Sequence, residues 1–201
     1  MAGGKTVAAQ RDAWICFEDE AGQTLRPPKA RTWGRRGHTP TVPVSGKGSG
    51  RISIAGLVCV KPGQRSRFIY RTIIHRGRKG ERRSFAETDY IALLDAAHQQ
   101  LHAPIVAIWD NLNTHTSVAM RQLIAARDWL HVIRLPAYAP DLNPTEGAWS
   151  HLKRSITNLA VYGLDHLQAI IKHRLKRIQY RPDLIDAFFT HTGLTLKPNS
   201  T

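Results

Sequence analysis

Carboxylates stand at three points of this sequence where a metal-assisted reaction could use them. An acidic run, Glu18-Asp19-Glu20, follows a short apolar segment, Asp110 follows a second apolar segment, and Glu146 lies in a proline-rich stretch further on. If the two apolar segments are neighbouring strands, their acids meet at one edge of a sheet, and the proline-rich stretch can bring Glu146 over that edge. The pattern leaves open which residue of the acidic run points there.

The chemistry that such a group supports is metal-dependent. Three carboxylates repel one another and need a cation to be stable together. Hard oxygen ligands without a His or Cys cluster suit Mg²⁺, with Mn²⁺ as a substitute. Two such ions, about 3.5–4 Å apart, would activate an attacking water or hydroxyl and stabilise the leaving oxygen of a phosphodiester.

The segment before Glu146 resembles a rigid elbow. Pro136, Pro140 and Pro144 hold the backbone extended or turned, and Asn143-Pro144 is typical of a helix N-cap followed by the first helical residue. The elbow would therefore deliver Glu146 to a fixed place at the start of a helix. The alternative is structural, because the same residues fit a capping box in which the glutamate folds back onto the N-cap amide.

The charge of the chain points to a polyanionic partner. The formal net charge is +14, and the sixty residues from Ala21 to Gly80 contain fourteen Lys and Arg and no Asp or Glu. Nucleic acid is the usual partner of such a surface, and a generic solubilising surface is the alternative. A membrane-spanning role is not expected, because a bilayer needs roughly 20 consecutive apolar residues and the apolar segments here are far shorter.

The length and cysteine content limit the class of protein to which this chain can belong. At 201 residues with 42% hydrophobic residues, the chain suits one globular domain. Cys16 and Cys59 both lie in apolar segments and are expected to be buried free thiols in a reducing compartment. The start of the chain lacks the apolar core of a signal peptide. We therefore expect a cytoplasmic, nucleoid-associated protein.

The elements that must position the acids follow from apolar patterning. Strands are predicted at 13–17, 51–60, 67–74, 105–109 and 130–135, and helices from Ser84 or Thr88 to 100, at 116–127, after Pro144, at 164–180 and at 183–190. This order predicts an α/β, ribonuclease H-like fold whose mixed five-stranded sheet has three antiparallel plus two parallel strands and is flanked by helices. The domain would cover 13–191, between a flexible N-terminal tail, 1–12, and a loose C-terminal tail, 192–201.

Several motifs of this chain resemble one enzyme family. They are Phe17-Glu18-Asp19-Glu20, Arg31-Thr32-Trp33-Gly34-Arg35-Arg36-Gly37, Trp109-Asp110-Asn111 with His115, and the segment from Leu135 to Glu146 with Trp149 and Leu152-Lys153. Together they are similar to the catalytic domain of DDE transposases (DDE superfamily endonucleases), in the bacterial insertion-sequence branch of the mariner-like superfamily. Thirty-five residues separate Asp110 from Glu146, a spacing that this family uses. The resemblance runs from about Trp14 to Pro182.

The resemblance implies that Asp19, Asp110 and Glu146 are the catalytic, metal-binding triad, and it alone selects Asp19 from the acidic run. Asn111 and His115 match supporting positions, and an orienting hydrogen bond or a helix cap is the alternative to metal ligation by His115. The residues expected to contact DNA are Arg31, Arg35, Arg36, Lys47, Arg51, Lys153 and Arg154. Trp33 is expected to pack beneath the arginine-rich hairpin.

The implied activity is cut-and-paste transposition of an insertion sequence. Two Mg²⁺ ions would support nicking of double-stranded DNA at the element ends, followed by attack of a 3′-hydroxyl on target DNA, usually at TA. A homodimer on DNA is expected by resemblance.

One departure from the family pattern concerns the N-terminus. Only 18 residues precede Asp19, which leaves no room for the family's helix-turn-helix region. A partial chain is therefore expected, with poorly specific DNA cleavage. The alternatives are a catalytically inert DNA-binding remnant and another ribonuclease H-like DNA nuclease.

Overall fold

A mixed five-stranded sheet forms the centre of the molecule. The computed structural model describes residues 2–28, 33–38, 41, 50–136 and 139–195. The strands are β1 (Trp14–Thr24), β2 (Arg51–Val60), β3 (Arg67–His75), β4 (Ile105–Trp109) and β5 (Leu130–Arg134), in the order β3-β2-β1-β4-β5. β1, β2 and β3 are antiparallel, whereas β4 and β5 run parallel to β1. The predicted ribonuclease H-like sheet, three antiparallel plus two parallel strands, is confirmed.

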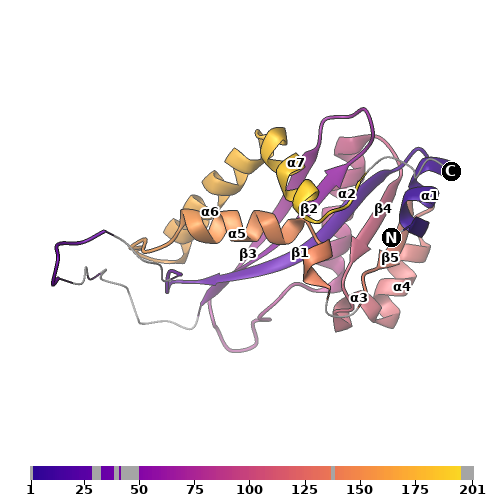
Figure 1. Ribbon diagram of the computed structural model, residues 1–201. Coiled ribbons are helices and arrows are strands. Elements are labelled where there is room, and N and C mark those ends of the chain that lie inside the picture. The colour runs from indigo at the N-terminus through magenta and orange to yellow at the C-terminus, as the bar shows by residue number, and fades with distance from the viewer. Residues whose placement is uncertain (1, 29–32, 39–40, 42–49, 137–138, 196–201) are drawn as a thin grey trace.

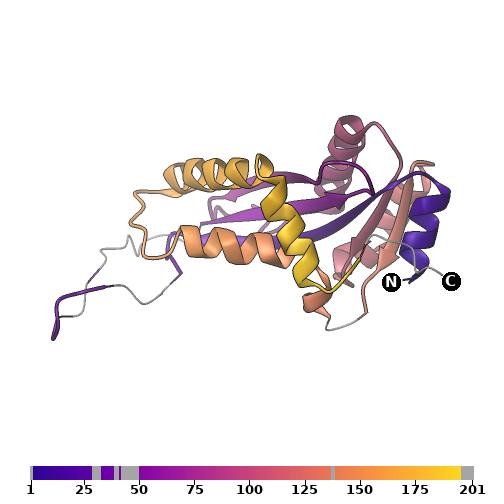
Figure 2. The same cartoon turned by 45° about the horizontal axis from the view of Figure 1, so that its top comes forward.

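Helices cover both faces of this sheet (Figures 1 and 2). One face carries α5 (Thr145–Ser155), α6 (Leu164–Gln179) and α7 (Pro182–His191), with α1 (Ala2–Gln10) packed on β1 and β4. The other face carries α2 (Glu87–Leu101), α3 (Asn113–Thr116) and α4 (Val118–Ala125). A 3₁₀ turn, η1 (Pro140–Leu142), precedes α5.

The alternation of side chains along β1 fills two separate cores. Ile15 and Phe17 belong to the core under α5, α6 and α7, whereas Trp14 and Cys16 belong to the core under α2. Because successive side chains of a strand point to opposite faces, Asp19 continues the side of Phe17, and Glu18 continues the side of Cys16.

β1 is longer than its apolar pattern predicts. The prediction ended the strand at Phe17, but the strand continues through the acidic run to Thr24, paired with β2 up to Arg51. Its parallel pairing with β4 does stop at Phe17, opposite Ile108. The acidic run therefore lies inside a strand, at the point where one of its two neighbours has ended.

The N-terminal tail prediction is wrong for residues 2–10, which form α1. Ala8 is buried in the core, and Gly4 lies so close to Ile133 that an added Cβ would be 3.1 Å from its Cδ1. Tertiary packing, which local patterning does not reveal, orders this segment. Of the predicted C-terminal tail, residues 196–201 lie outside the described residues.

The predicted helix at 116–127 is interrupted. Ser117 has extended backbone (φ −63°, ψ 158°), and its hydroxyl accepts the amide of Met120, so it caps α4 and separates it from α3. No helix in the described part of the chain combines the length and apolar character needed to cross a bilayer.

Candidate active site

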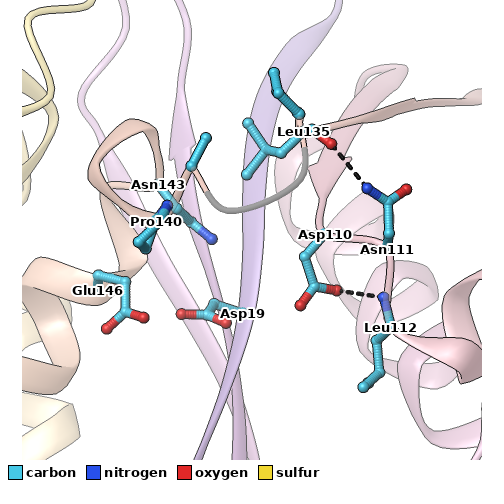
Figure 3. Close-up of a pocket in the computed structure, with 10 residues that line it drawn as sticks. Asp19, Asp110, Asn111, Leu112, Leu135, Pro140, Asn143 and Glu146 are labelled. Carbon is cyan, nitrogen blue, oxygen red and sulfur yellow. Dashed lines mark hydrogen bonds between the residues drawn. The ribbon is translucent and has the colours of Figure 1, made fainter.

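The three predicted acids line one cavity of about 440 Å³. Asp19 comes from the middle of β1, Asp110 follows β4, and Glu146 lies in the first turn of α5. In Figure 3 the carboxylates of Asp19 and Glu146 point toward each other, and Asp110 lies on the other side of Asp19. The full lining is Asp19, Asp110, Asn111, Leu112, Leu135, Pro136, Ala139, Pro140, Asn143 and Glu146.

Asp19 is the member of the acidic run that faces this cavity. Glu18 points to the opposite side of β1 and is 2% exposed, and Glu20 accepts a 2.7 Å hydrogen bond from the Tyr90 hydroxyl of α2. Burial raises the pKa of Glu18 well above its usual range. Strand alternation, combined with the position of α5 on the Phe17 side, thus resolves the placement that the sequence left open.

Asp19 occupies an electrostatically unfavourable position for an anion. Burial, followed by the charge of Glu146, raises the pKa of Asp19 to about 7, and Asp110 adds a smaller repulsion. The Trp149 indole Nε1 donates a 3.1 Å hydrogen bond to Oδ2 of Asp19, and this hydrogen bond lowers the pKa of Asp19. A bound cation would relieve this repulsion.

Gly56 makes room for that tryptophan. It lies opposite Asp19 in the β1–β2 ladder, and a Cβ on Gly56 would be 2.8 Å from Cη2 of Trp149 and 3.1 Å from the Phe68 ring. The indole can therefore cross the strand and reach Asp19 because residue 56 has no side chain.

Asp110 is held as an anion by its neighbours. Its Oδ1 accepts hydrogen bonds from Nδ1 of His115 and from the Leu112 amide, both at 2.9 Å. The His115 hydrogen bond is the main reason that the pKa of Asp110 is lowered. Nearby, the Asn111 side chain donates to the Leu135 carbonyl at 3.1 Å and ties the end of β4 to the end of β5. His115 thus has the predicted orienting contact.

The elbow before α5 is fastened to the backbone of β1. The Asn143 side chain donates a 2.9 Å hydrogen bond to the Glu18 carbonyl, and the Thr145 hydroxyl donates a 2.7 Å bond to the Phe17 carbonyl. Both residues are buried. These two contacts, which we call the elbow latch, occupy the edge of β1 near the point where β4 has ended. Apart from the predicted helix start, no pattern in this segment indicates these contacts.

The hydrogen bonds of the elbow contradict the capping-box alternative for Glu146. Oδ1 of Asn143 accepts the Thr145 amide at 3.1 Å, and Pro144 is the residue that immediately precedes α5. The Asn143 amide, which a capping box would direct to Glu146, donates instead to the Pro140 carbonyl at 2.8 Å. Glu146 is therefore not needed for the cap, and its carboxylate faces the cavity.

The donor set fits a hard divalent cation, because it consists of carboxylates in a basic protein. Within the described residues, no three His, Cys, Asp or Glu side chains lie close enough to ligate one ion as they stand. An Mg²⁺ ion usually takes only one or two carboxylates, with waters and substrate phosphates as its other ligands.

The predicted DNA-contacting residues are spread over two regions. Arg35 and Arg36 are exposed in segment 33–38, Arg51 is partly exposed at the start of β2, and Lys153 and Arg154 are exposed on α5. Arg31 and Lys47 lie outside the described residues. Trp33 is fully exposed, so its predicted packing beneath a hairpin is wrong.

A basic surface on α5 and α6 extends the predicted set. The pKa of His151 is lowered by burial and then by Arg154, Arg177 and Arg181, so these cations gather around one point. Lys172, Lys176 and Arg177 are exposed on α6. None of these α6 residues is among the predicted DNA contacts.

Comparisons with known proteins agree on the kind of domain. The family model described as DDE superfamily endonuclease matches residues 14–168. A Mos1 mariner paired-end complex with Mg is similar in structure (TM-score 0.62, 14% identity, 96% of this chain and 59% of that chain). The Mos1 mariner transposase catalytic domain aligns with 98% of this chain and 93% of its own length (TM-score 0.53, 13% identity).

Several of the structural matches concern the fold of a part of longer chains. At such identities the structural matches show the fold, and the chain spans about 60% of the length of the Mos1 transposase in a paired-end complex with left transposon end (TM-score 0.59, 13% identity, 96% of this chain). No curated protein sequence matches the chain.

Proposed function

The chain belongs to the DDE superfamily endonucleases, and from that membership we propose that it is the catalytic domain of a transposase that cuts and joins double-stranded DNA. The observation that carries the proposal is the convergence of Asp19, Asp110 and Glu146, from three separate elements, on one cavity. An insertion-sequence element is the proposed source.

The three carboxylates would hold two Mg²⁺ ions, which Mn²⁺ could replace. Such ions, when bound, supply an activated water or 3′-hydroxyl and stabilise the leaving oxygen of the phosphodiester. The raised pKa of Asp19 supports this assignment, because Asp19 is buried and lies beside the charge of Glu146, and a bound cation would stabilise its ionised form. Mos1 mariner paired-end complexes with Mg and with Mn are among the structural matches.

The protein's own residues orient these ligands. His115 and the Leu112 amide fix one oxygen of Asp110. Trp149 orients Asp19 through its indole N–H. The elbow latch, Asn143 and Thr145, sets the distance between α5 and β1 and therefore the position of Glu146. Each acid has its own support, and α5 contributes to two of these supports, since it carries Trp149 as well as Thr145.

The proposed substrate is DNA at the element ends and at the target. The acid-free segment 21–80 and the basic surface of α5 and α6 lie in different parts of the sequence and offer contacts to phosphates. A homodimer on DNA is proposed because two ends must be cut and joined together. A Mos1 paired-end complex and a Mos1 strand transfer complex are similar in fold.

The test is cleavage of a labelled DNA duplex with Mg²⁺ or Mn²⁺. Wild type should cut, whereas Asp110→Ala and Glu146→Gln should lose cleavage. Equal activity in all three proteins would overturn the triad. Transfer of a pre-cut 3′ end into a plasmid separates a transposase from a nuclease that only hydrolyses.

A further inference from the structure

Glu18 is a buried carboxylate that the proposed reaction does not use. It lies on the opposite side of β1 from Asp19 and is 2% exposed. Neither of its side-chain oxygens accepts a hydrogen bond from a described residue. Burying an ionisable group without hydrogen bonds costs stability, so an apolar side chain would serve the core better at this position.

The Glu18 carboxylate closely approaches the imidazole of His115. Nε2 of His115 lies 3.4 Å from Oε2 of Glu18, and Nδ1, on the other side of the ring, lies 2.9 Å from Oδ1 of Asp110. The imidazole therefore stands between a buried carboxylate and a predicted metal ligand.

Two aromatic rings restrict the motion of this imidazole. Trp109 stacks on it at 4.3 Å between centroids with an interplanar angle of 7°, and Tyr90 meets it edge-on at 4.7 Å and 76°. Stacking fixes the plane of the ring but not which way round the ring lies, because a half-turn flip about the Cβ–Cγ bond keeps the same plane and exchanges ring nitrogens with carbons. The Nδ1 hydrogen bond to Asp110 and the 3.4 Å approach of Nε2 to Glu18 distinguish these two orientations.

Asp110 depends on this ring for the orientation of its carboxylate. Its Oδ1 is engaged by His115 and by the Leu112 amide. Its side chain is 58% exposed, and among the described residues no hydrogen bond involves Oδ2. One oxygen is thus held by the protein, and the other remains available to a ligand.

We propose that Glu18 is a positioning residue that fixes the His115 ring and, through it, directs the free oxygen of Asp110 toward the metal site. The inference rests on the proposed function, since it assigns Glu18 a task toward the same ions. A carboxylate, an imidazole and a second carboxylate in line form an outer support of the kind whose loss typically costs 10–100-fold in metal affinity or activity. The support crosses the sheet, from one side of β1 to the cavity on the other.

The experiment compares Mn²⁺ affinity, measured by calorimetry, with thermal stability. Glu18→Met keeps the length of the side chain and removes its polar atoms. We expect its melting temperature to be at least that of wild type, while Mn²⁺ binds about tenfold more weakly. A purely structural residue would lower stability and leave the affinity of the folded protein unchanged.

Glu20→Gln is the matched control. It lies two residues along the same side of β1, but its carboxylate contacts Tyr90 instead of His115. Its Mn²⁺ affinity should equal that of wild type, whereas Glu18→Met should weaken Mn²⁺ binding and shift the NMR signals of the His115 ring.

A double-mutant comparison tests the route through His115. His115→Phe keeps a ring between Trp109 and Tyr90 and removes both nitrogens, so it should also weaken Mn²⁺ binding about tenfold. Combined with Glu18→Met, it should cause no further loss, because the two residues act in series. A product of the two effects, about a hundredfold, would show independent roles and overturn the inference.

The remaining outcomes separate the inference from the proposed function. Wild type that does not bind Mn²⁺, or Asp110→Asn that binds it as tightly as wild type, would overturn the proposed function and the inference with it. Glu18→Met with unchanged affinity, when these two controls behave as expected, overturns the inference alone. If Glu18→Met does not fold, Glu18→Gln takes its place in the test. The inference then requires Glu18→Gln to shift the NMR signals of the His115 ring and to weaken Mn²⁺ binding.

Discussion

The hydroxyl of Thr145 donates a 2.7 Å hydrogen bond to the carbonyl of Phe17. This contact joins the start of the helix that carries Glu146 to the strand that carries Asp19. Asn143 makes the second contact, to the carbonyl of the next residue, Glu18. Cleavage should therefore respond to changes at positions that do not themselves bear a carboxylate.

Thr145→Val should weaken both stability and cleavage. The substitution keeps the shape of a fully buried side chain and leaves the Phe17 carbonyl without its partner, which costs about 1–3 kcal/mol. Even small displacements of a catalytic group can lower rates about a hundredfold. Urea unfolding and initial cleavage rates would measure the two effects. Thr190→Val, which removes a hydroxyl contact within α7, is the control, and wild-type cleavage by Thr145→Val would contradict the role of the latch.

Gly56→Ala should disturb Asp19 from the neighbouring strand. The added methyl would stand 2.8 Å from the Trp149 ring, and such overpacking costs about 1–3 kcal/mol. The displaced indole would lose its hydrogen bond to Asp19, so the pKa of Asp19 should rise and cleavage should need a higher pH. Gly22→Ala is the control, because its methyl would meet only the mobile end of Arg51. An unchanged pH profile in Gly56→Ala would refute this dependence.

Mg²⁺ should stabilise the protein more at pH 8 than at pH 5. The folded-state pKa of Asp19 is about 7, above its ordinary 3.8, so between these values the folded state binds more protons than the unfolded state. Without metal, the contribution of Asp19 to stability therefore falls as pH rises from about 4 to about 7. Bound Mg²⁺ offsets this loss of stability at pH 8. A free Mg²⁺ concentration of 100 times Kd adds about 2.7 kcal/mol to the free energy of unfolding.

Differential scanning calorimetry at the two pH values checks that prediction. Asp19→Asn removes the titrating group and should abolish most of the Mg²⁺ effect at pH 8. Equal stabilisation of wild type and Asp19→Asn at both pH values would exclude Asp19 from the site.

Arg154→Gln and Arg177→Gln should each weaken DNA binding to a similar extent for every DNA sequence. If each arginine contacts one phosphate, the slope of log K against log salt should fall in magnitude by about 0.9 per substitution. Fluorescence anisotropy across a salt series would measure it. Arg11→Gln is the control. The Arg11 side chain donates a hydrogen bond to the carbonyl of Asp128, which lies just before β5 and away from the cavity. Slopes equal to wild type would remove α5 and α6 from the DNA surface.

Much of the fold was accessible to sequence patterning, for identifiable reasons. β2 and β4 have the predicted bounds, because each is an apolar run with turn or polar residues on both sides. The second half of β1 escaped prediction because residues 18–24 contain no run of large apolar side chains, and their strand geometry comes from pairing with β2. α1 escaped because packing on β1 and β4, not periodicity, orders it.

The candidate active site could be predicted from the sequence only in part. Apolar strands followed by acids predicted the convergence of Asp110 with the acidic run, but choosing Asp19 required knowledge of which side of β1 faces α5. Glu18 is acidic like Asp19, but its side chain lies on the opposite side of β1, in the core under α2. The elbow latch depends on two side-chain contacts to a strand more than a hundred residues away, and no local pattern encodes such partners.

That separation has a consequence for when activity can arise. The latch joins residues 128 and 125 positions apart, and contacts of such high contact order form late in folding. A nascent chain ending before residue 140 would carry Asp19 and Asp110 but neither Glu146 nor the groups that hold it. Because β5 ends at Arg134, Glu146 is synthesised only after all five strands, and the set of three acids is complete only once α5 has been added.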